Sequence, residues 1–242
     1  MKIDVKLAKF KQNTNVLAVD IPAHLRLRHM CGIDWLDETI GGFVPTTVTM
    51  LTGDPGCGKS TLLRQLADGI TGQGHACLMN TGEESVEQVA MSTERLNLKH
   101  GFVIGQDTMC DAVINHAENV KARNPGKQLF LLQDSLVTLD DGFYKDGTIN
   151  SQTPIRVTEQ LTSWAKKTHA IVVFINQVTK NGAFVGKNTV KHIIDSHIEL
   201  KFDREKKSET YGERIFSVSK NRWACSGQEF VVKMGSTGLK VN

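Results

Sequence analysis

The chain has 242 residues, 40% of them apolar and 23% charged, which suits one large globular domain or a domain with a modest appendage and excludes disordered, collagen-like and coiled-coil chains. Its 29 Lys and Arg against 26 Asp and Glu leave a net charge of +3, too small to indicate nucleic-acid binding by bulk charge, so any basic surface must be local. Neither a run of roughly 20 apolar residues nor a signal-peptide core is present, so we expect a cytoplasmic protein with no membrane partner.

Residues 1–27 are expected to form an N-terminal extension whose order the sequence does not define, followed by one domain at 28–242. Within that domain, short apolar runs alternate with segments whose apolar residues recur at helical spacing. The expected strands are 47–52, 75–80, 129–134 and 170–176, and the expected helices are 61–70, 85–96, 109–123 and 154–168. This alternation predicts an α/β fold with a mainly parallel sheet flanked by helices.

The pattern changes after residue 195, where strand-like runs follow one another with no helix between them. These runs are 197–202, 214–220, 229–234 and 239–241. Strands joined without a crossover helix are typical of antiparallel pairing. We therefore expect antiparallel strands that extend the sheet.

A phosphate-binding motif, G-x-x-x-x-G-K-[ST], lies between the first predicted strand and the first predicted helix, at residues 53–60 (the P-loop). Glycines let backbone N–H groups approach phosphate oxygens, and a helix N-terminus adds positive potential. We expect Lys59 to reach the β and γ phosphates of ATP and Ser60 to place its hydroxyl on Mg²⁺. The residues expected to bind the nucleotide are Gly53, Asp54, Pro55, Gly56, Cys57, Gly58, Lys59, Ser60 and Thr61.

Cys57 lies inside the P-loop, close to the start of the predicted helix. The dipole and exposed N–H groups of a helix N-terminus favour a thiolate, so we expect a reactive thiol that bound nucleotide shields. The alternative is a side chain that fills a variable loop position and packs inward.

P-loop sites need a second acidic group, and Asp134 supplies one in the segment LFLLQD. It stands at the carboxyl end of a predicted strand, which is where ligand sites of α/β sheets lie. We expect Asp134 and Ser60 to hold Mg²⁺, partly through water. The alternative is an Asp that ends the strand and caps a turn.

Hydrolysis also needs a group that orients and deprotonates water. Glu83 and Glu84 follow the second predicted strand, at the same edge as the P-loop, and we expect Glu83 to be catalytic and Glu84 structural. The alternative for both is a favourable position at the N-terminus of the next helix. Gln177 follows the strand 170–176 and is expected to sense the γ phosphate, unless it is a solvated loop side chain.

The order of these elements resembles that of the RecA-like ATPases, and the finer resemblance is to the bacterial RadA (Sms) DNA-repair ATPases and, more distantly, to KaiC and DnaB-type hexameric ATPases. The motifs that carry it are GIDWLDETIGG at 32–42, GDPGCGKSTLL at 53–63, TGEES at 81–85, VTKNGAFVGKNTVKHIID at 178–195 and SKNRW at 219–223. The KNRFG motif of RadA proteins stands here as KNRWA, and Gln177 replaces the usual His. We expect a minimal core without the zinc module and the Lon-like domain of RadA proteins.

The resemblance implies a RecA-like P-loop core and a Mg²⁺-dependent ATPase that binds single-stranded DNA and couples hydrolysis to DNA translocation or remodelling in recombination, repair or replication. It also implies a homo-oligomeric ring, expected to be a hexamer, and a recombinase or replication protein as a further partner. One alternative is a KaiC-like ATP-dependent switch or assembly protein that is not a motor. The other is a DNA-binding recombination mediator with little hydrolysis.

Two segments are candidates for DNA contact. The first carries Lys180, Phe184, Lys187 and Lys191 among glycines and is expected to be a basic pore loop, unless it is a solvated surface loop. The second, at 135–152, carries Phe143 and Tyr144 among acidic residues. These two aromatic side chains would either stack on bases or pack at a subunit contact.

Lys220 and Arg222 are separated by one residue at the end of a predicted strand and would point to the same side if the strand continued. In the light of the RadA resemblance, we expect both to act across a subunit boundary and to complete a neighbour's ATP site. The alternative is a pair of cations at a strand end that contacts solvent or a local acid such as Glu229.

Overall fold

The computed structural model describes residues 15, 17, 19–177 and 189–241. Their strands are β1 (Val48–Gly53), β2 (Ala76–Thr81), β3 (Val103–Gly105), β4 (Leu129–Asp134), β5 (Ile171–Ile175), β6 (Ser196–Phe202), β7 (Arg214–Asn221), β8 (Glu229–Gly235) and β9 (Gly238–Lys240). The α-helices are α1 (Asp34–Ile40), α2 (Lys59–Gly72), α3 (Val86–Arg95), α4 (Cys110–Ala122), α5 (Thr153–Thr168) and α6 (Thr189–Ile193). Two 3-10 helices, η2 (Ala23–Arg26) and η3 (Leu136–Thr138), complete the set for these ranges.

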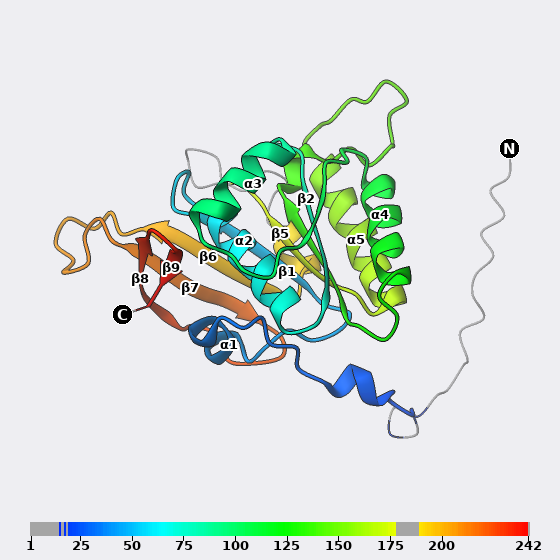
Figure 1. Ribbon diagram of the computed structural model, residues 1–242, viewed down its shortest axis with the longest axis horizontal. Helices are drawn as coiled ribbons and strands as arrows, with labels where there is room; N and C mark the ends of the chain where they lie inside the picture. The colour runs from blue at the N-terminus through cyan, green and yellow to red at the C-terminus, as the bar shows by residue number, and fades with distance from the viewer. Residues whose placement is uncertain (1–14, 16, 18, 178–188, 242) are drawn as a thin grey trace, which may run out of the picture.

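The strands of the described residues form one sheet in the order β3-β2-β4-β5-β1-β6-β7-β8-β9 (Figure 1). The six strands from β3 to β6 in this order are parallel, and β7, β8 and β9 are antiparallel to their neighbours. A mainly parallel sheet with antiparallel C-terminal strands is thus confirmed. β1, which leads into the P-loop, lies between β5 and β6 in the middle of the sheet.

The expectation for β6 was wrong in one respect, because β6 pairs parallel to β1 on one side and antiparallel to β7 only on the other. The segment between β5 and β6 contains α6, which was expected to be loop. After α6, the N–H of Asp195 donates to the carbonyl of Val48, at the beginning of β1. The chain therefore returns to the end of the sheet where β1 begins. Because β6 starts there, it runs parallel to β1.

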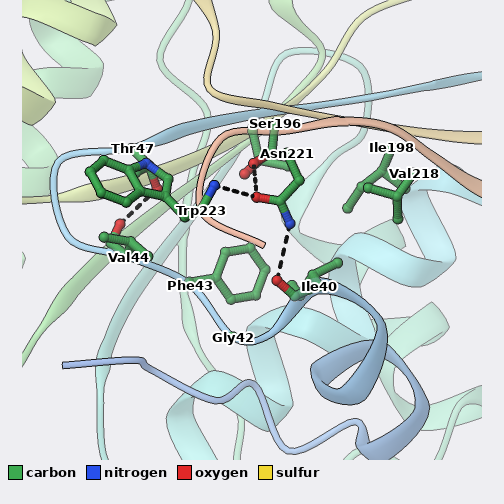
Figure 2. A pocket seen from close by; sticks show the side chains of 11 residues that line it. Ile40, Gly42, Phe43, Val44, Thr47, Ser196, Ile198, Val218, Asn221 and Trp223 are labelled. Carbon is green, nitrogen blue, oxygen red and sulfur yellow. Dashed lines mark hydrogen bonds between the residues drawn. The ribbon is translucent and has the colours of Figure 1, made fainter. Parts of the chain in front are cut away.

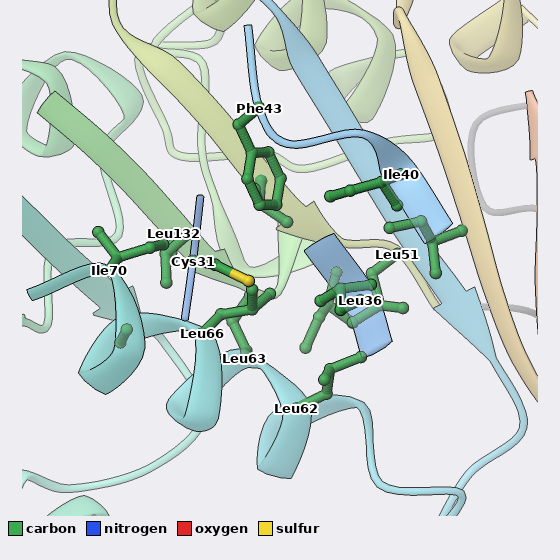
Figure 3. Close-up of a cluster of buried hydrophobic side chains, with 14 of the residues drawn as sticks. Cys31, Leu36, Ile40, Phe43, Leu51, Leu62, Leu63, Leu66, Ile70 and Leu132 are labelled. Carbon is green, nitrogen blue, oxygen red and sulfur yellow. The ribbon is translucent and has the colours of Figure 1, made fainter. Parts of the chain in front are cut away.

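Two hydrophobic clusters cover the two faces of the sheet. Alternate residues of β1 point to opposite faces, so Leu51 joins one cluster and Met50 the other. Figure 3 shows the first cluster, in which leucines of α2 and Leu36 of α1 pack against the sheet. The second cluster contains the inward-facing residues of α4 and α5. Burial on both faces explains why the parallel strands read as nearly continuous apolar runs.

The hairpin formed by β8 and β9 packs against α2, the helix that follows the P-loop. The side chain of Gln65 on α2 accepts a hydrogen bond from the N–H of Leu239 at 2.8 Å. From β7, Arg214 Nε donates to the carbonyl of Cys57 at 3.1 Å, and its guanidinium lies 5.0 Å from the centre of the Phe202 ring. The antiparallel strands therefore contact the P-loop directly.

Of residues 15–27, the described part contains η2, none of whose residues is buried. The described residues include no helix with both the length and the apolar character needed to cross a bilayer.

Candidate nucleotide site

The P-loop turns sharply between β1 and α2, and two of its glycines allow the turn. Gly53 has φ 148° and Gly58 has φ 107°, backbone angles that residues with a Cβ rarely adopt. A Cβ on Gly53 would overlap the carbonyl of Leu200 on β6, and one on Gly58 would crowd the methyl group of Met234 on β8. Glycine is therefore required at both positions for the loop to lie this close to its neighbouring strands.

The N-terminus of α2 fits a phosphate group. Its N-cap is Gly58, and no side chain caps the first N–H groups of the helix. Such uncapped N–H groups, together with the helix dipole, attract anions. The ammonium of Lys59 folds over the loop and donates to the carbonyls of Gly53 at 3.0 Å and Asp54 at 2.8 Å. A cation and several backbone donors thus converge on the space above the P-loop, which suits the phosphates of a nucleotide.

Ser60 and Asp134 lie together, as expected of a pair that holds Mg²⁺. The Ser60 side chain is close enough to the Asp134 carboxylate to affect its pKa, and Asp134 is almost fully buried. Burial raises the pKa of Asp134, while Ser60 and the charge of Arg64 act in the opposite direction. A bound divalent cation would favour the ionised carboxylate in the same way.

The donor set suits Mg²⁺ that arrives with a nucleotide rather than a resident metal ion. Across the described ranges, no group of three or more His, Cys, Asp and Glu side chains could hold a metal ion. Mg²⁺ in nucleotide sites needs only one or two protein oxygens, because phosphates and waters supply the others. Ser60 and Asp134 meet this requirement.

Glu83 lies within a cluster formed by the ends of three adjacent strands. Its Oε1 accepts a hydrogen bond from Ser135 Oγ at 2.5 Å and another from Gln177 Nε2 at 2.9 Å. Glu83 follows β2, Ser135 follows β4 and Gln177 lies just beyond β5. The structure thus brings Glu83 and Gln177 together. Ser135 was not expected in this cluster, although its place directly after Asp134 at a strand end was a usable signal.

Glu84 instead forms an ion pair with Arg64 of α2. Arg64 is only 4% exposed, so its charge needs a partner. The two glutamates are not first-turn residues of α3, because Ser85 is the N-cap and forms a capping box with Gln88. The two carboxylates therefore differ in their contacts. Glu84 neutralises the buried Arg64, whereas Glu83 contacts polar side chains at the ends of the strands.

The expectation of a reactive thiol at Cys57 was wrong. The side chain is fully buried in the first hydrophobic cluster. Burial raises the pKa of Cys57 and outweighs the lowering by Lys59. The dipole argument assumed a solvent-exposed side chain, whereas the P-loop turns this one inward.

Lys220 and Arg222 lie at the opposite end of the parallel strands from the P-loop. Lys220 is paired with His197 near the start of β6, and its ammonium donates to the carbonyls of Lys191 and Ile194 at 2.7 and 2.6 Å. Arg222 is half-exposed and donates to Asp195 Oδ1 at 3.2 Å. Lys220 therefore binds the C-terminal end of α6, while Arg222 lies at the surface. Neither lies at its own chain's P-loop.

Among the candidate DNA contacts, Lys180, Phe184 and Lys187 lie outside the described residues. Lys191 lies on α6, where its carbonyl accepts the hydrogen bond from Lys220.

The loop between η3 and α5 projects from the body of the molecule (Figure 1). It contains Phe143 and Tyr144. Their side chains are 65% and 37% exposed, and their ring centres lie 4.9 Å apart in a T-shaped arrangement. The guanidinium of Arg156 lies 4.5 Å from the centre of the Phe143 ring and forms an ion pair with the buried side chain of Asp141. Phe143 and Tyr144 thus form an exposed aromatic surface that packs on Arg156 of α5.

A small cavity lies near Arg222, at the end of β7 (Figure 2). Asn221 forms part of its wall, donating from Nδ2 to the carbonyl of Ile40 at 3.1 Å and accepting from the N–H of Trp223 at 3.1 Å. Its lining includes no titratable side chain, and it lies far along the strands from the P-loop. We therefore assign it no catalytic role.

Known proteins resemble this chain in sequence and in fold. The family model "ATPase: KaiC" matches residues 30–130. The DNA repair protein RadA of Brucella abortus (strain 2308) is 33% identical over 218 residues, which are 88% of this chain and 45% of that protein. The chain thus spans less than half the length of this curated relative.

Two solved structures share the fold. A DnaB-like replicative helicase superposes with a TM-score of 0.74 at 13% identity, over 85% of this chain and 59% of the helicase chain. A KaiC-like protein from Pyrococcus horikoshii OT3 superposes with a TM-score of 0.69 at 19% identity, over 88% of this chain and 97% of the other. At these identities the likeness shows the fold alone.

Proposed function

We propose that the chain is a RadA-like ATPase of the RecA superfamily, which hydrolyses ATP with Mg²⁺ and binds single-stranded DNA. In this proposal, hydrolysis is coupled to movement along DNA or to its remodelling in recombination, repair or replication. The observation that carries the proposal is the meeting of four groups at one edge of the sheet. They are Lys59 over the P-loop, Ser60 on Asp134, Glu83, and Gln177 on Glu83.

Each group has a role that its position supports. The α2 N-terminus and Lys59 bind the phosphates and stabilise the charge that gathers on the γ phosphate. Ser60 and Asp134 would hold Mg²⁺, which supplies further charge stabilisation to the phosphates. Glu83 orients the attacking water and accepts its proton. Gln177 contacts Glu83 and senses the γ phosphate, because its amide can donate to either group.

We further propose that the protein acts as a ring of identical subunits, expected to be a hexamer. Arg222 lies at the end of the strands opposite to its own P-loop, so it can serve an ATP site only on another subunit. It is also half-exposed, as a trans-acting side chain must be. Lys220 instead supports this edge from within by binding the carbonyls of α6.

For single-stranded DNA we propose that Phe143 and Tyr144 stack on bases. Exposed aromatic rings held in one orientation lose little entropy on binding, and stacking is worth about 1–3 kcal/mol per base. The acidic side chains in the same loop argue against a phosphate contact here. The basic residues Lys180, Lys187 and Lys191 would contact the phosphates instead.

Replacing Phe143 and Tyr144 together with alanine should weaken binding of single-stranded DNA by about tenfold or more. The dependence of affinity on salt should stay unchanged, because stacking releases no condensed counterions. Replacing Lys180, Lys187 and Lys191 with alanine should, by contrast, lower both the affinity and the salt dependence. Fluorescence titrations at several salt concentrations measure both quantities.

The control for the aromatic variant is Tyr211→Ala, at an exposed tyrosine of the connection between β6 and β7. If the double variant binds DNA normally but its solution mass falls, the two rings form a subunit contact instead.

The whole proposal is tested by the rate of ATP hydrolysis with and without single-stranded DNA, measured together with the solution mass in ATP. We expect turnover that DNA stimulates and a mass several times that of one chain. Turnover that ignores DNA would favour a KaiC-like switch. ATP-dependent DNA binding without turnover would favour a recombination mediator.

A further inference from the structure

The proposed base Glu83 is held by a serine that the reaction scheme above does not use. We propose that Ser135 is a positioning residue that aims the Glu83 carboxylate at the attacking water, an inference that rests on the proposed ATPase function. Ser135 is fully buried, and its hydroxyl donates to Glu83 Oε1 at 2.5 Å. Gln177 donates to the same oxygen at 2.9 Å. Two donors on Oε1 hold the carboxylate in one orientation. In this proposal, Oε2 is the oxygen that accepts the proton of the attacking water.

Ser135 is itself held by a buried polar network. Its carbonyl accepts hydrogen bonds from Gln133 Nε2 at 3.0 Å and from Thr138 Oγ1 at 2.8 Å. Gln133 Oε1 in turn accepts from Asn80 Nδ2 at 2.9 Å. Gln133 and Asn80 are fully buried on the adjacent strands β4 and β2. Such second-layer hydrogen bonds restrict the motion of the groups that touch a reaction.

The loop that carries Glu83 is fixed against the same network from the other side. The N–H of Gly82 donates to the carbonyl of Asp134 at 3.0 Å. A Cβ at Gly82 would crowd the hydroxyl of Thr138. The backbone next to Glu83 therefore cannot move away from Ser135 without breaking this hydrogen bond.

This arrangement gives two adjacent residues different tasks at one strand end. The Asp134 side chain lies near Ser60, where Mg²⁺ is expected, and the Ser135 side chain donates a hydrogen bond to Glu83. A misplacement of a reacting group by about 1 Å can cost on the order of 10²-fold in rate. Loss of the Ser135 hydroxyl should therefore slow the chemical step without weakening ATP binding.

The test is a double-mutant cycle of Ser135→Ala and Glu83→Gln, with kcat and KM measured in single- and multiple-turnover assays and the Kd of an ATP analogue measured separately. We expect Ser135→Ala to lower kcat by about tenfold to a hundredfold while KM and Kd stay near wild type. In the Glu83→Gln background it should add no further loss, since it acts through Glu83. A purely structural role would lower the residual rate by the same factor in both backgrounds.

Ser135→Cys keeps nearly the same volume with a weaker donor, so its kcat should fall between those of wild type and Ser135→Ala; it also serves if Ser135→Ala does not fold. Ser217→Ala is the matched control, because Ser217 is a buried serine on β7 away from Glu83. Unchanged kcat in Ser135→Ala or Ser135→Cys, or additive losses in the cycle, would overturn the role of Ser135 alone. A wild-type chain without any turnover would overturn the proposed function itself.

Discussion

Alanine in place of Arg222 should leave ATP binding near wild type and reduce turnover by about 10³-fold or more, the range in which trans-acting arginines contribute. The guanidinium would stabilise the charge on a neighbour's γ phosphate, so its loss affects the transition state more than the bound nucleotide. The hydrogen bond from the Arg222 side chain to Asp195 is partly solvated, so the fold should survive its loss. ATPase assays and nucleotide titrations separate the two effects.

Mixing Arg222→Ala with Lys59→Ala tests whether the site is shared. Each variant alone should be inactive, but a mixed ring contains interfaces with an intact P-loop on one side and an intact Arg222 on the other. Activity should therefore recover in part, with a maximum near equal proportions. Arg95→Ala, an exposed arginine on α3, serves as the control. No recovery, combined with a monomeric mass in ATP, would refute both the shared site and the ring.

Glu83→Gln and Glu84→Gln should give opposite phenotypes although the residues are neighbours. Glutamine at Glu83 keeps the shape but cannot accept a proton, so hydrolysis should fall by about 10²–10⁴-fold while ATP stays bound. Glutamine at Glu84 leaves the buried Arg64 without a counter-charge, which should cost about 1.5–3 kcal/mol of unfolding free energy. Its ATPase rate should remain much closer to wild type.

Urea denaturation and ATPase assays of both variants test this assignment. Wild-type stability with lost turnover in Glu84→Gln, next to an active Glu83→Gln, would exchange the roles of the two carboxylates.

The parallel part of the fold was predictable because its strands are buried on both faces, and a strand such as β4 therefore reads as a short apolar run. The β3 strand and α6 were missed for the opposite reason. They contain 3 and 5 residues, which is too short for a periodic pattern to emerge. The direction of β6 depends on α6 and so could not be predicted without it.

At the site, the sequence predicts the proximity of residues that belong to one motif, such as Lys59 and Ser60 of the P-loop. It does not predict contacts made by residues from different elements. Glu83 and Glu84 are adjacent residues of the same type, and only their contacts distinguish them: Arg64 of α2 pairs with Glu84, while Ser135 and Gln177 donate to Glu83. Ser135 belongs to no spacing pattern, because its partner Glu83 lies on another strand end.

The contact of β7 and the β8–β9 hairpin with the P-loop has a mechanical consequence. Arg214 binds the carbonyl of Cys57, Met234 lies against Gly58, and Leu239 is bonded to Gln65 on the helix that follows. Strands β7, β8 and β9 thus support the P-loop and α2 through direct contacts. We expect that a displacement of the hairpin, by a neighbouring subunit or another protein, would also move the P-loop. Such a displacement would change the affinity of the proposed site for nucleotide.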